Sequence, residues 1–243
     1  MLEKTRGIVL HHIRYGETSI IAHIYTEARG RQSFLFKGIR SPKSKTRPNL
    51  LQPLFILNIE SYYRETRELH LVKEASLYKT FVFPYDYRKG AQALFISEIL
   101  YKVLREESSN PDLFEFLVSS IEYFDLSEEG ASNFHIFFLV KLMRFLGILP
   151  SQRESREAGY FDLKEGEYQS VIPDHSEYLE PFQTRFLQYL LHAGYPNLSR
   201  LRMNRHDRHL VIEQILKFYS LHVEGMEKLK SYSVLKEVFG GDR

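Results

Sequence analysis

The sequence predicts an α+β protein with two domains, a small five-stranded β-barrel or sandwich over residues 1–80 and an all-α helical domain over residues 81–243. Two observations lead to this prediction. Up to about residue 80, short β-branched and aromatic runs alternate along the chain and are separated by turn signals. From about residue 85, apolar residues recur at helical spacing instead. The change of period near residue 82 therefore marks the predicted domain boundary.

Five runs in the first domain have the character of strands. They cover residues 5–14, 18–26, 31–38, 51–63 and 68–78. The connections between them are short and contain Gly or charged residues, as is typical of turns. Five strands in about eighty residues is the size of an OB-fold, although the alternation alone also allows other small antiparallel barrels or sandwiches.

Six runs in the second domain have helical spacing. They cover residues 91–106, 111–124, 131–146, 181–193, 208–225 and 231–239. The third is apolar on nearly all sides, which is typical of a helix buried centrally, and Gly147 with Pro150 just beyond predicts where it ends. Residues 151–175 are polar and irregular, and we expect a small insert there with a hairpin around Gly166.

Composition and motifs favour a binding protein over an enzyme. The chain has no cysteine, which excludes a disulfide framework, a thiolate nucleophile and a cysteine-bound metal. Neither a phosphate-binding glycine loop nor a nucleophile elbow is present, and the ten histidines are scattered or, as at His11-His12, point to opposite faces of a strand. We therefore predict no catalytic residue, no metal and no cofactor. With no secretory signal or membrane-spanning run, the expected location is the cytoplasm, with no membrane partner.

Charge is concentrated at one end of the chain. Residues 1–47 carry ten Lys or Arg and three Glu, whereas residues 48–243 carry 23 Lys or Arg and 28 acids. No acid occurs from Ala28 to Ile59. A local excess of this kind predicts a polyanionic partner, and nucleic acid is the most common one. A basic loop that serves only solubility is the alternative.

The predicted DNA-binding residues are the cations on this stretch and its neighbouring turn, together with one exposed aromatic. They are Arg14, Tyr15, Arg29, Arg31, Lys37, Arg40, Lys43, Lys45 and Arg47. Long cations on loops suit phosphate contacts, which depend on salt but little on sequence. Tyr15 is the preferred stacking residue, because Phe34 and Phe36 share one strand face and are expected in the core. Tyr62 and Tyr63 point opposite ways, so one of them at most can join that surface.

Several segments resemble the RecO family of bacterial recombination mediators. In order along the chain these are Gly7-Ile8-Val9-Leu10, Tyr15-Gly16-Glu17-Thr18-Ser19, Gly30-Arg31, Lys37-Gly38-Ile39-Arg40-Ser41-Pro42-Lys43-Ser44 and Leu142-Met143-Arg144-Phe145-Leu146-Gly147. The resemblance implies an N-terminal OB-fold, binding to single- and double-stranded DNA, and annealing of complementary strands. It also implies partnership with RecR, loading of RecA onto DNA coated by single-strand-binding protein (SSB), and association with the nucleoid.

The resemblance has two further consequences in the helical domain. The acidic tail of SSB ends in an apolar residue, so its receptor needs cations beside an apolar pocket, and Lys141 and Arg144 have suitable chemistry. The ordinary explanation is that these two residues are simply the exposed edge of their helix. Many RecO-like proteins carry a four-cysteine zinc site after that helix, but this chain has no cysteine, so we expect aromatic packing around Phe161 and Tyr168 in its place.

Two other functions fit the sequence. An OB-fold that binds RNA or associates with the ribosome would use the same basic loops, because phosphate contacts do not distinguish the sugar. An enzyme with a site assembled from scattered His, Glu and Lys is the third possibility, and no motif supports it.

Overall fold

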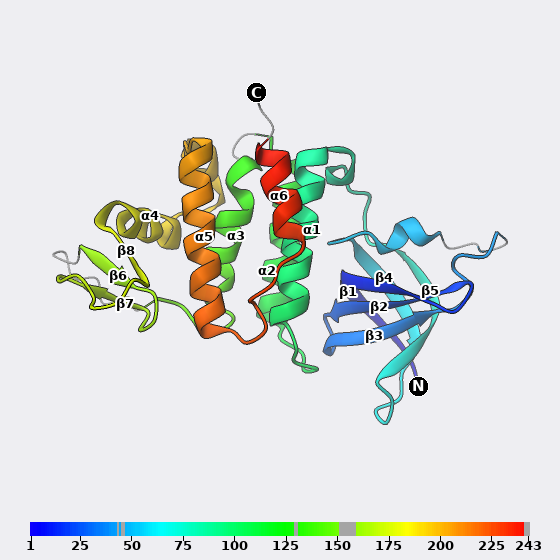
Figure 1. The fold of residues 1–243 in the computed structure, drawn as a ribbon. Coiled ribbons are helices and arrows are strands. Elements are labelled where there is room, and N and C mark those ends of the chain that lie inside the picture. Colours follow the sequence, from blue (N-terminus) through cyan, green and yellow to red (C-terminus); the bar gives the residue numbers. More distant parts are fainter. Residues whose placement is uncertain (43, 45–46, 129–130, 151–158, 241–243) are drawn as a thin grey trace. The chain divides into compact units, whose positions relative to one another are not determined.

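The computed structural model describes residues 1–42, 44, 47–128, 131–150 and 159–240 (Figure 1). The density of contacts divides the chain into two compact units. The first contains residues 1–126 and 229–235, and the second contains residues 127–228 and 236–243. The predicted division at residue 80 is a different boundary, drawn from the change of period, and it stays a prediction.

Five strands close into a barrel at the start of the first unit. They are β1 (Leu2–Tyr15), β2 (Ser19–Thr26), β3 (Gly30–Phe36), β4 (Ile56–Tyr62) and β5 (Leu69–Leu77). Their order around the barrel is β1-β2-β3-β5-β4, with β3 and β5 parallel and the other pairs antiparallel. Closure leaves the sheet without free edges. This barrel confirms the five predicted strands.

One part of the predicted fourth strand is wrong. Residues 51–55 do not extend β4 but form the end of a 3-10 turn, η1 (Pro48–Leu51), and a tight bend. Leu54 has a φ of 64°, a left-handed conformation that a strand cannot contain. Two backbone hydrogen bonds to β1 fix the bend. The Leu54 N–H donates to the Val9 carbonyl (2.9 Å), and the Val9 N–H donates to the Phe55 carbonyl (2.9 Å).

Two long helices complete the first unit. A short turn, η2 (Phe83–Tyr85), leads into α1 (Tyr87–Val103), and α2 (Pro111–Leu126) follows. The Asp86 carboxylate caps α1 by accepting from the Arg88 and Lys89 N–H groups. Helix α1 packs on the barrel, and its Ser97 hydroxyl donates to the Leu10 carbonyl of β1 (2.5 Å). The buried Asp125 of α2 accepts from the Val82 and Phe83 N–H groups, which holds η2 in place.

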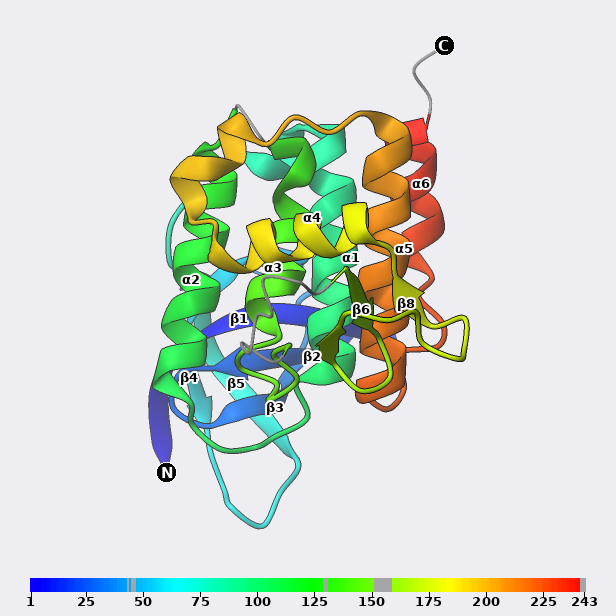
Figure 2. The same ribbon diagram turned by 90° about the vertical axis from the view of Figure 1, so that its left-hand side faces the viewer.

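The second unit consists mainly of helices and a small sheet (Figure 2). Its elements are η3 (Ala131–Asn133), α3 (Phe134–Leu142), β6 (Tyr160–Asp162), β7 (Glu167–Gln169), β8 (Tyr178–Leu179), α4 (Pro181–His192), η4 (Tyr195–Arg200) and α5 (Arg205–His222). The last helix, α6 (Ser231–Gly240), contributes its first residues to the first unit and the rest to the second. Figure 2 shows α4 running across α3, and both α4 and α5 contact α3.

The apolar helix is buried as predicted. All its residues from Phe134 to Val140, and Leu142, are buried, and the Tyr219 hydroxyl of α5 donates to the Leu139 carbonyl (2.8 Å). After Leu142 the chain continues in turns up to Gly147, whose φ is 69°, and the Ile148 N–H bonds back to the Met143 carbonyl (3.1 Å). This is a glycine-terminated helix end of the Schellman type. No helix in the described ranges is long and apolar enough to cross a membrane.

Candidate nucleic-acid interface

The predicted basic residues lie at two different ends of β3. Arg29 and Arg31 are at its beginning, and Lys37 and Arg40 follow its end. A strand of this length spans roughly 20 Å. The two groups therefore cannot form one contact surface through neighbouring residues, although they look continuous in the sequence.

The group at the beginning of β3 is engaged within the first unit. The Arg29 Nε donates to both carboxylate oxygens of Glu3 (3.0 and 3.1 Å), and its guanidinium lies 3.9 Å from the ring centre of Tyr63. Arg31 donates from Nη1 to the Tyr101 carbonyl (3.2 Å), and its guanidinium is 5.6 Å from the Tyr101 ring centre. Both cations therefore already have protein partners that a phosphate would have to replace.

Gly30 allows another segment of the chain to pack against the beginning of β3. Its φ is 62°, and a Cβ there would lie 2.5 Å from the carbonyl oxygens of both Glu106 and Ser108. The Arg31 N–H donates to the same Glu106 carbonyl (2.9 Å). The segment after α1 thus packs directly on the backbone of β3, at a distance that only glycine permits.

The face of β2 and β3 is covered as well. In OB-folds this face commonly binds oligonucleotides. Here the Tyr101 ring of α1 lies 4.8 Å from the ring centre of His11 and 5.2 Å from that of His23, and the His23 Nδ1 is bonded to the Ser33 hydroxyl (3.1 Å). Burial lowers the pKa of both histidines. The Tyr101 ring therefore covers part of this face, and the Arg31 guanidinium beside it is engaged with the same tyrosine.

The group beyond β3 remains available. The Arg40 N–H donates to the Thr18 carbonyl (2.9 Å) and the Gly38 N–H to the Ser19 hydroxyl (3.2 Å), so the loop after β3 is fixed to the turn between β1 and β2. Arg14 of β1 pairs with Ile20 of β2, and Ile20 pairs in turn with Phe36 of β3. The backbones of Arg14 and Phe36 are therefore two strand spacings, or about 10 Å, apart. Arg14 and Lys37 thus belong to the same end of the barrel.

The side chains at this end have the exposure that phosphate binding needs. Arg14, Lys37 and Arg47 are exposed, Arg40 is half-buried, and Tyr15 is 52% exposed. Within the part of the chain that the structure describes, no carboxylate forms an ion pair with any of these four cations. Lys43 and Lys45 lie outside the described residues. Arg47 comes later in the chain, directly before η1. We use the name basic end of the barrel for Arg14, Tyr15, Lys37 and Arg40 together with Arg47.

The other aromatic predictions are confirmed in part. Phe34 and Phe36 are 3% and 4% exposed and belong to the core, as expected. Tyr62 is 50% exposed, whereas Tyr63 lies under the Arg29 guanidinium, so the two rings do point different ways.

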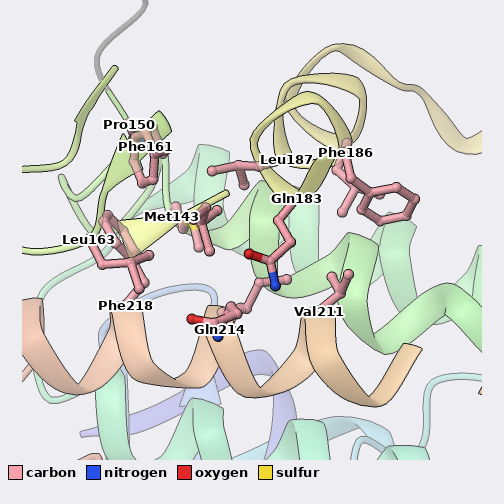
Figure 3. A pocket seen from close by; sticks show the side chains of 13 residues that line it. Met143, Pro150, Phe161, Leu163, Gln183, Phe186, Leu187, Val211, Gln214 and Phe218 are labelled. Carbon is pink, nitrogen blue, oxygen red and sulfur yellow. The ribbon is translucent and has the colours of Figure 1, made fainter. Parts of the chain in front are cut away.

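The two residues predicted to bind a partner differ in their surroundings. Lys141 is half-buried, its Nζ donates to the Leu191 carbonyl at the end of α4 (2.7 Å), and burial lowers its pKa. Arg144 is exposed. Its neighbour Met143 lines an apolar pocket with Phe161, Leu187 and Phe218, shown in Figure 3. The free volume in this pocket is about 20 Å³, which is room for a water molecule but not for a large side chain.

A hydrogen-bonded carboxylate organises the small sheet of the second unit. Asp162 is 2% exposed, and it accepts from the Lys164 and Glu165 N–H groups (2.8 and 3.1 Å), the Gln169 amide (3.2 Å) and the His175 Nε2 (3.1 Å). The Glu177 N–H donates to the His175 Nδ1 (3.2 Å), so a neutral imidazole carries its proton on Nε2 and donates it to Asp162. The expected packing of Phe161 on Tyr168 is also present, with ring centres 5.0 Å apart.

No metal site accompanies this arrangement. Among the residues with described positions, no group of three or more His, Asp or Glu could hold a metal ion. Asp162 instead forms the hydrogen bonds that shape the β6–β7 turn, in which Gly166 has a φ of 71°.

Some candidate residues were missed by the sequence analysis. Asn49, Gln52 and Tyr85 line a cavity beside Arg47. The signal for Tyr85 was available, because Tyr85-Asp86-Tyr87-Arg88-Lys89 interleaves aromatic and basic residues next to the predicted domain boundary. The amides carried no such signal, since only the bend at Leu54 brings them next to the end of β5.

Comparison with known proteins agrees with the barrel and the helices. The family model described as "Recombination protein O N terminal" matches residues 1–81, and "Recombination protein O C terminal" matches residues 84–233. Together with the closed five-stranded barrel, the first match confirms the predicted OB-fold.

Curated relatives match over the whole chain. The DNA repair protein RecO of Bacteroides fragilis is 40% identical over 241 residues, which are 98% of this chain and 100% of the relative. That of Phocaeicola vulgatus is 39% identical over 240 residues, with the same coverage. That of Christiangramia forsetii is 31% identical over 242 residues, 99% of this chain and 100% of the relative. With both family models matched and relatives of this similarity, the chain belongs to the RecO family of DNA repair proteins.

Proposed function

We propose that this chain binds single- and double-stranded DNA at the basic end of its barrel. The observation that carries the proposal is the set of cations that protrude there with no carboxylate partner among the described residues, Arg14, Lys37, Arg40 and Arg47. Lys43 and Lys45 belong to the same loop in the sequence and are part of the proposal. Arg29 and Arg31 have a lesser part in it, because their guanidinium groups are already engaged.

The biochemical role follows from the family. We propose that the chain anneals complementary strands and, together with RecR, helps load RecA onto DNA coated by SSB. A protein that holds DNA by its phosphates leaves base edges free to pair, which suits annealing. A protein that binds DNA in this way associates with the nucleoid in the cell. No catalytic step is part of the proposal.

Contact with SSB is the part of the proposal that involves the second unit. Arg144 is exposed and directly follows Met143, which lines the apolar pocket in Figure 3, and its charge suits an acidic tail. Lys141 is held by the Leu191 carbonyl, so we propose Arg144 as the main electrostatic contact. A tail with an apolar last residue would have to displace side chains of the pocket, since the free volume is small.

The test is DNA binding as a function of salt. Fluorescence anisotropy of a labelled single strand gives the affinity at several salt concentrations, and each phosphate contact contributes about −0.7 to the log–log slope on a single strand. Contacts from Arg14, Lys37, Arg40 and Arg47 alone predict a slope of about −3, and contacts from Lys43 and Lys45 as well would steepen it to about −4. The variant Arg40→Ala/Arg47→Ala should bind more weakly, with a slope flatter by about 1.4.

A matched control uses two cations of the turn between β4 and β5. Arg64→Ala/Arg67→Ala removes the same charge from exposed positions, where Glu65 and Glu68 already balance the arginines. This control should change the slope little. Equal losses in the two double variants would show that binding depends on overall charge rather than on the basic end of the barrel.

Annealing and the type of nucleic acid are tested with the same proteins. Wild-type protein should accelerate annealing of complementary DNA strands, including SSB-coated strands, and Arg40→Ala/Arg47→Ala should do so more slowly. Much tighter binding to RNA than to DNA of the same sequence, without annealing of DNA, would favour an RNA-binding function instead.

A further inference from the structure

A cavity of about 390 Å³ lies beside the basic end of the barrel and away from the β2–β3 face. It is open to solvent on one side, and the loop before β4, the end of β5 and η2 line it. Its polar lining is formed by Arg47, Asn49, Gln52 and Thr80, and its exposed wall by Tyr85. The volume is in the range of small-molecule sites, about 300–1,000 Å³. The cavity therefore has room for a ligand of the size of a nucleotide.

The apolar part of the lining combines aromatic and aliphatic residues, namely Phe55, Phe81, Tyr85, Leu50, Ala75, Leu77 and Pro84. Phe55 and Phe81 are 7% and 1% exposed, and their ring centres are 5.7 Å apart with an interplanar angle of 32°. Tyr85 is 89% exposed, and only the backbone bond from its N–H to the Val82 carbonyl (3.0 Å) links it to the preceding turn. A tyrosine ring that is so exposed offers a face on which a flat ligand can stack.

The polar part of the lining has no negative charge. The described lining residues carry one guanidinium, two carboxamides and two hydroxyls, and none of them is Asp or Glu. Carboxamides both donate and accept hydrogen bonds, and Arg47 can bind a phosphate. This combination suits a ligand with an anionic group, a planar ring and polar ring edges.

The backbone holds these groups in fixed positions. Leu54 takes its left-handed conformation between two lining residues, Gln52 and Phe55, and the Phe55 N–H donates to the Gln52 carbonyl (3.1 Å). A left-handed backbone is unfavourable in free energy for a residue other than glycine, so contacts in the surrounding structure must stabilise it. Here the bonds between Leu54, Phe55 and Val9 stabilise it, so the bend is a fixed part of the barrel.

We infer that this cavity binds one unstacked base of single-stranded DNA, with Arg47 on an adjacent phosphate. The inference rests on the proposed function and extends it from the phosphates to a base. An apolar side chain of a peptide would fill the apolar part of the cavity but would use neither the amides of Asn49 and Gln52 nor the charge of Arg47. Because every base has a π-face, the site takes any base and adds affinity without sequence preference.

The test compares two single strands of the same length and charge. One carries bases throughout, and the other carries abasic residues at its central positions. Binding is measured by anisotropy with the full chain at one salt concentration. Wild-type protein should prefer the base-bearing strand by roughly 5- to 150-fold, the range expected for stacking of one base on an aromatic side chain.

The substitution Tyr85→Ala should remove most of this preference while the affinity for the abasic strand stays unchanged. The side chain is exposed, so its removal leaves the core intact. Tyr87→Ala is the matched control, because Tyr87 is also an exposed tyrosine (66%) and does not line the cavity. A second pair of variants tests the side-chain amide of Asn49 in the same way. Asn49→Ala should weaken the preference for bases, and Asn58→Ala is its control, since Asn58 is exposed on β4 and does not line the cavity.

The outcomes separate this inference from the proposed function. Salt-dependent binding to both strands with equal affinity would overturn the base site and leave phosphate binding in place. A preference that survives Tyr85→Ala, or is lost equally in Tyr87→Ala, would also overturn it. If an acidic peptide with an apolar last residue binds wild-type protein but not Tyr85→Ala, and no base preference exists, the cavity belongs to a peptide. Absence of binding to either strand at low salt would refute the proposed function itself.

Discussion

Arg29 and Arg40 belong to one basic stretch of sequence, yet replacing each of them by alanine should affect a different property of the protein. Arg29 donates to Glu3 and lies over the Tyr63 ring, and its side chain and that of Glu3 are 33% and 17% exposed. Arg40 is held only through its backbone N–H, which alanine retains. We therefore expect Arg29→Ala to lower stability and Arg40→Ala to lower DNA affinity.

The expected magnitudes follow from these contacts. An ion pair that is still partly exposed to water contributes about 0.2–1 kcal/mol, and a cation–π contact near the surface about 0.5–1 kcal/mol. Arg29→Ala should therefore reduce the free energy of unfolding by about 1–2 kcal/mol. For a chain of this size this corresponds to a fall in Tm of roughly 2–8 °C. Arg40→Ala should stay within about 0.5 kcal/mol of the wild type.

Calorimetry and the anisotropy series together measure both effects. Arg40→Ala should flatten the salt slope by about 0.7, and Arg29→Ala should leave it nearly unchanged. The variant Glu3→Gln serves as a partner control, because its effect on Tm should not add to that of Arg29→Ala if the two residues act as a pair. A wild-type Tm for Arg29→Ala with a flattened salt slope would refute the reasoning, since Arg29 would then be a DNA contact.

Two further predictions concern the second unit. Asp162→Ala leaves four donors without their acceptor in a buried site, and should reduce the free energy of unfolding by about 3–5 kcal/mol. Amide hydrogen exchange over residues 160–179 should become faster. Unchanged protection there would contradict the structural role of Asp162. Burial, with a smaller effect from the charge of Arg208, lowers the pKa of His135 from 6.5 to about 3. Below pH 6.5 the unfolded chain therefore takes up a proton at His135 that the folded chain does not. The free energy of unfolding should therefore fall with decreasing pH, and His135→Leu should reduce that slope by about 1.4 kcal/mol per pH unit between pH 6 and 5. The same slope in His135→Leu, measured by urea unfolding, would show that His135 is protonated in the folded chain.

Much of the fold follows from local patterns. Phe34 and Phe36 alternate with half-buried neighbours along β3, and the apolar run of α3 is buried on all sides, as the two periods predict. The error at residues 51–55 has a local cause. An apolar run has the composition of a strand, and only the left-handed backbone of Leu54 turns it into a bend. No composition rule reveals that conformation in a leucine.

The interface was less predictable because it depends on pairings between distant residues. Sequence showed a stretch with many cations and no acid, but not that β3 separates Arg29 from Arg40. Nor did it show that Glu3 and Tyr63, which lie far from Arg29 in the chain, neutralise and cover it. Which cations remain available for a ligand is a property of the closed barrel, and it appears only once all five strands are in register.

The hydrogen bonds around Asp162 determine what can damage the small sheet of the second unit. Carboxylate, carboxamide, imidazole and backbone amide groups hold it together, and none of these is a thiolate that peroxide oxidises readily. A chelator has nothing to extract from such a network either. Among the described residues, the order of this sheet therefore depends on one carboxylate shared by four donors rather than on a thiolate cluster.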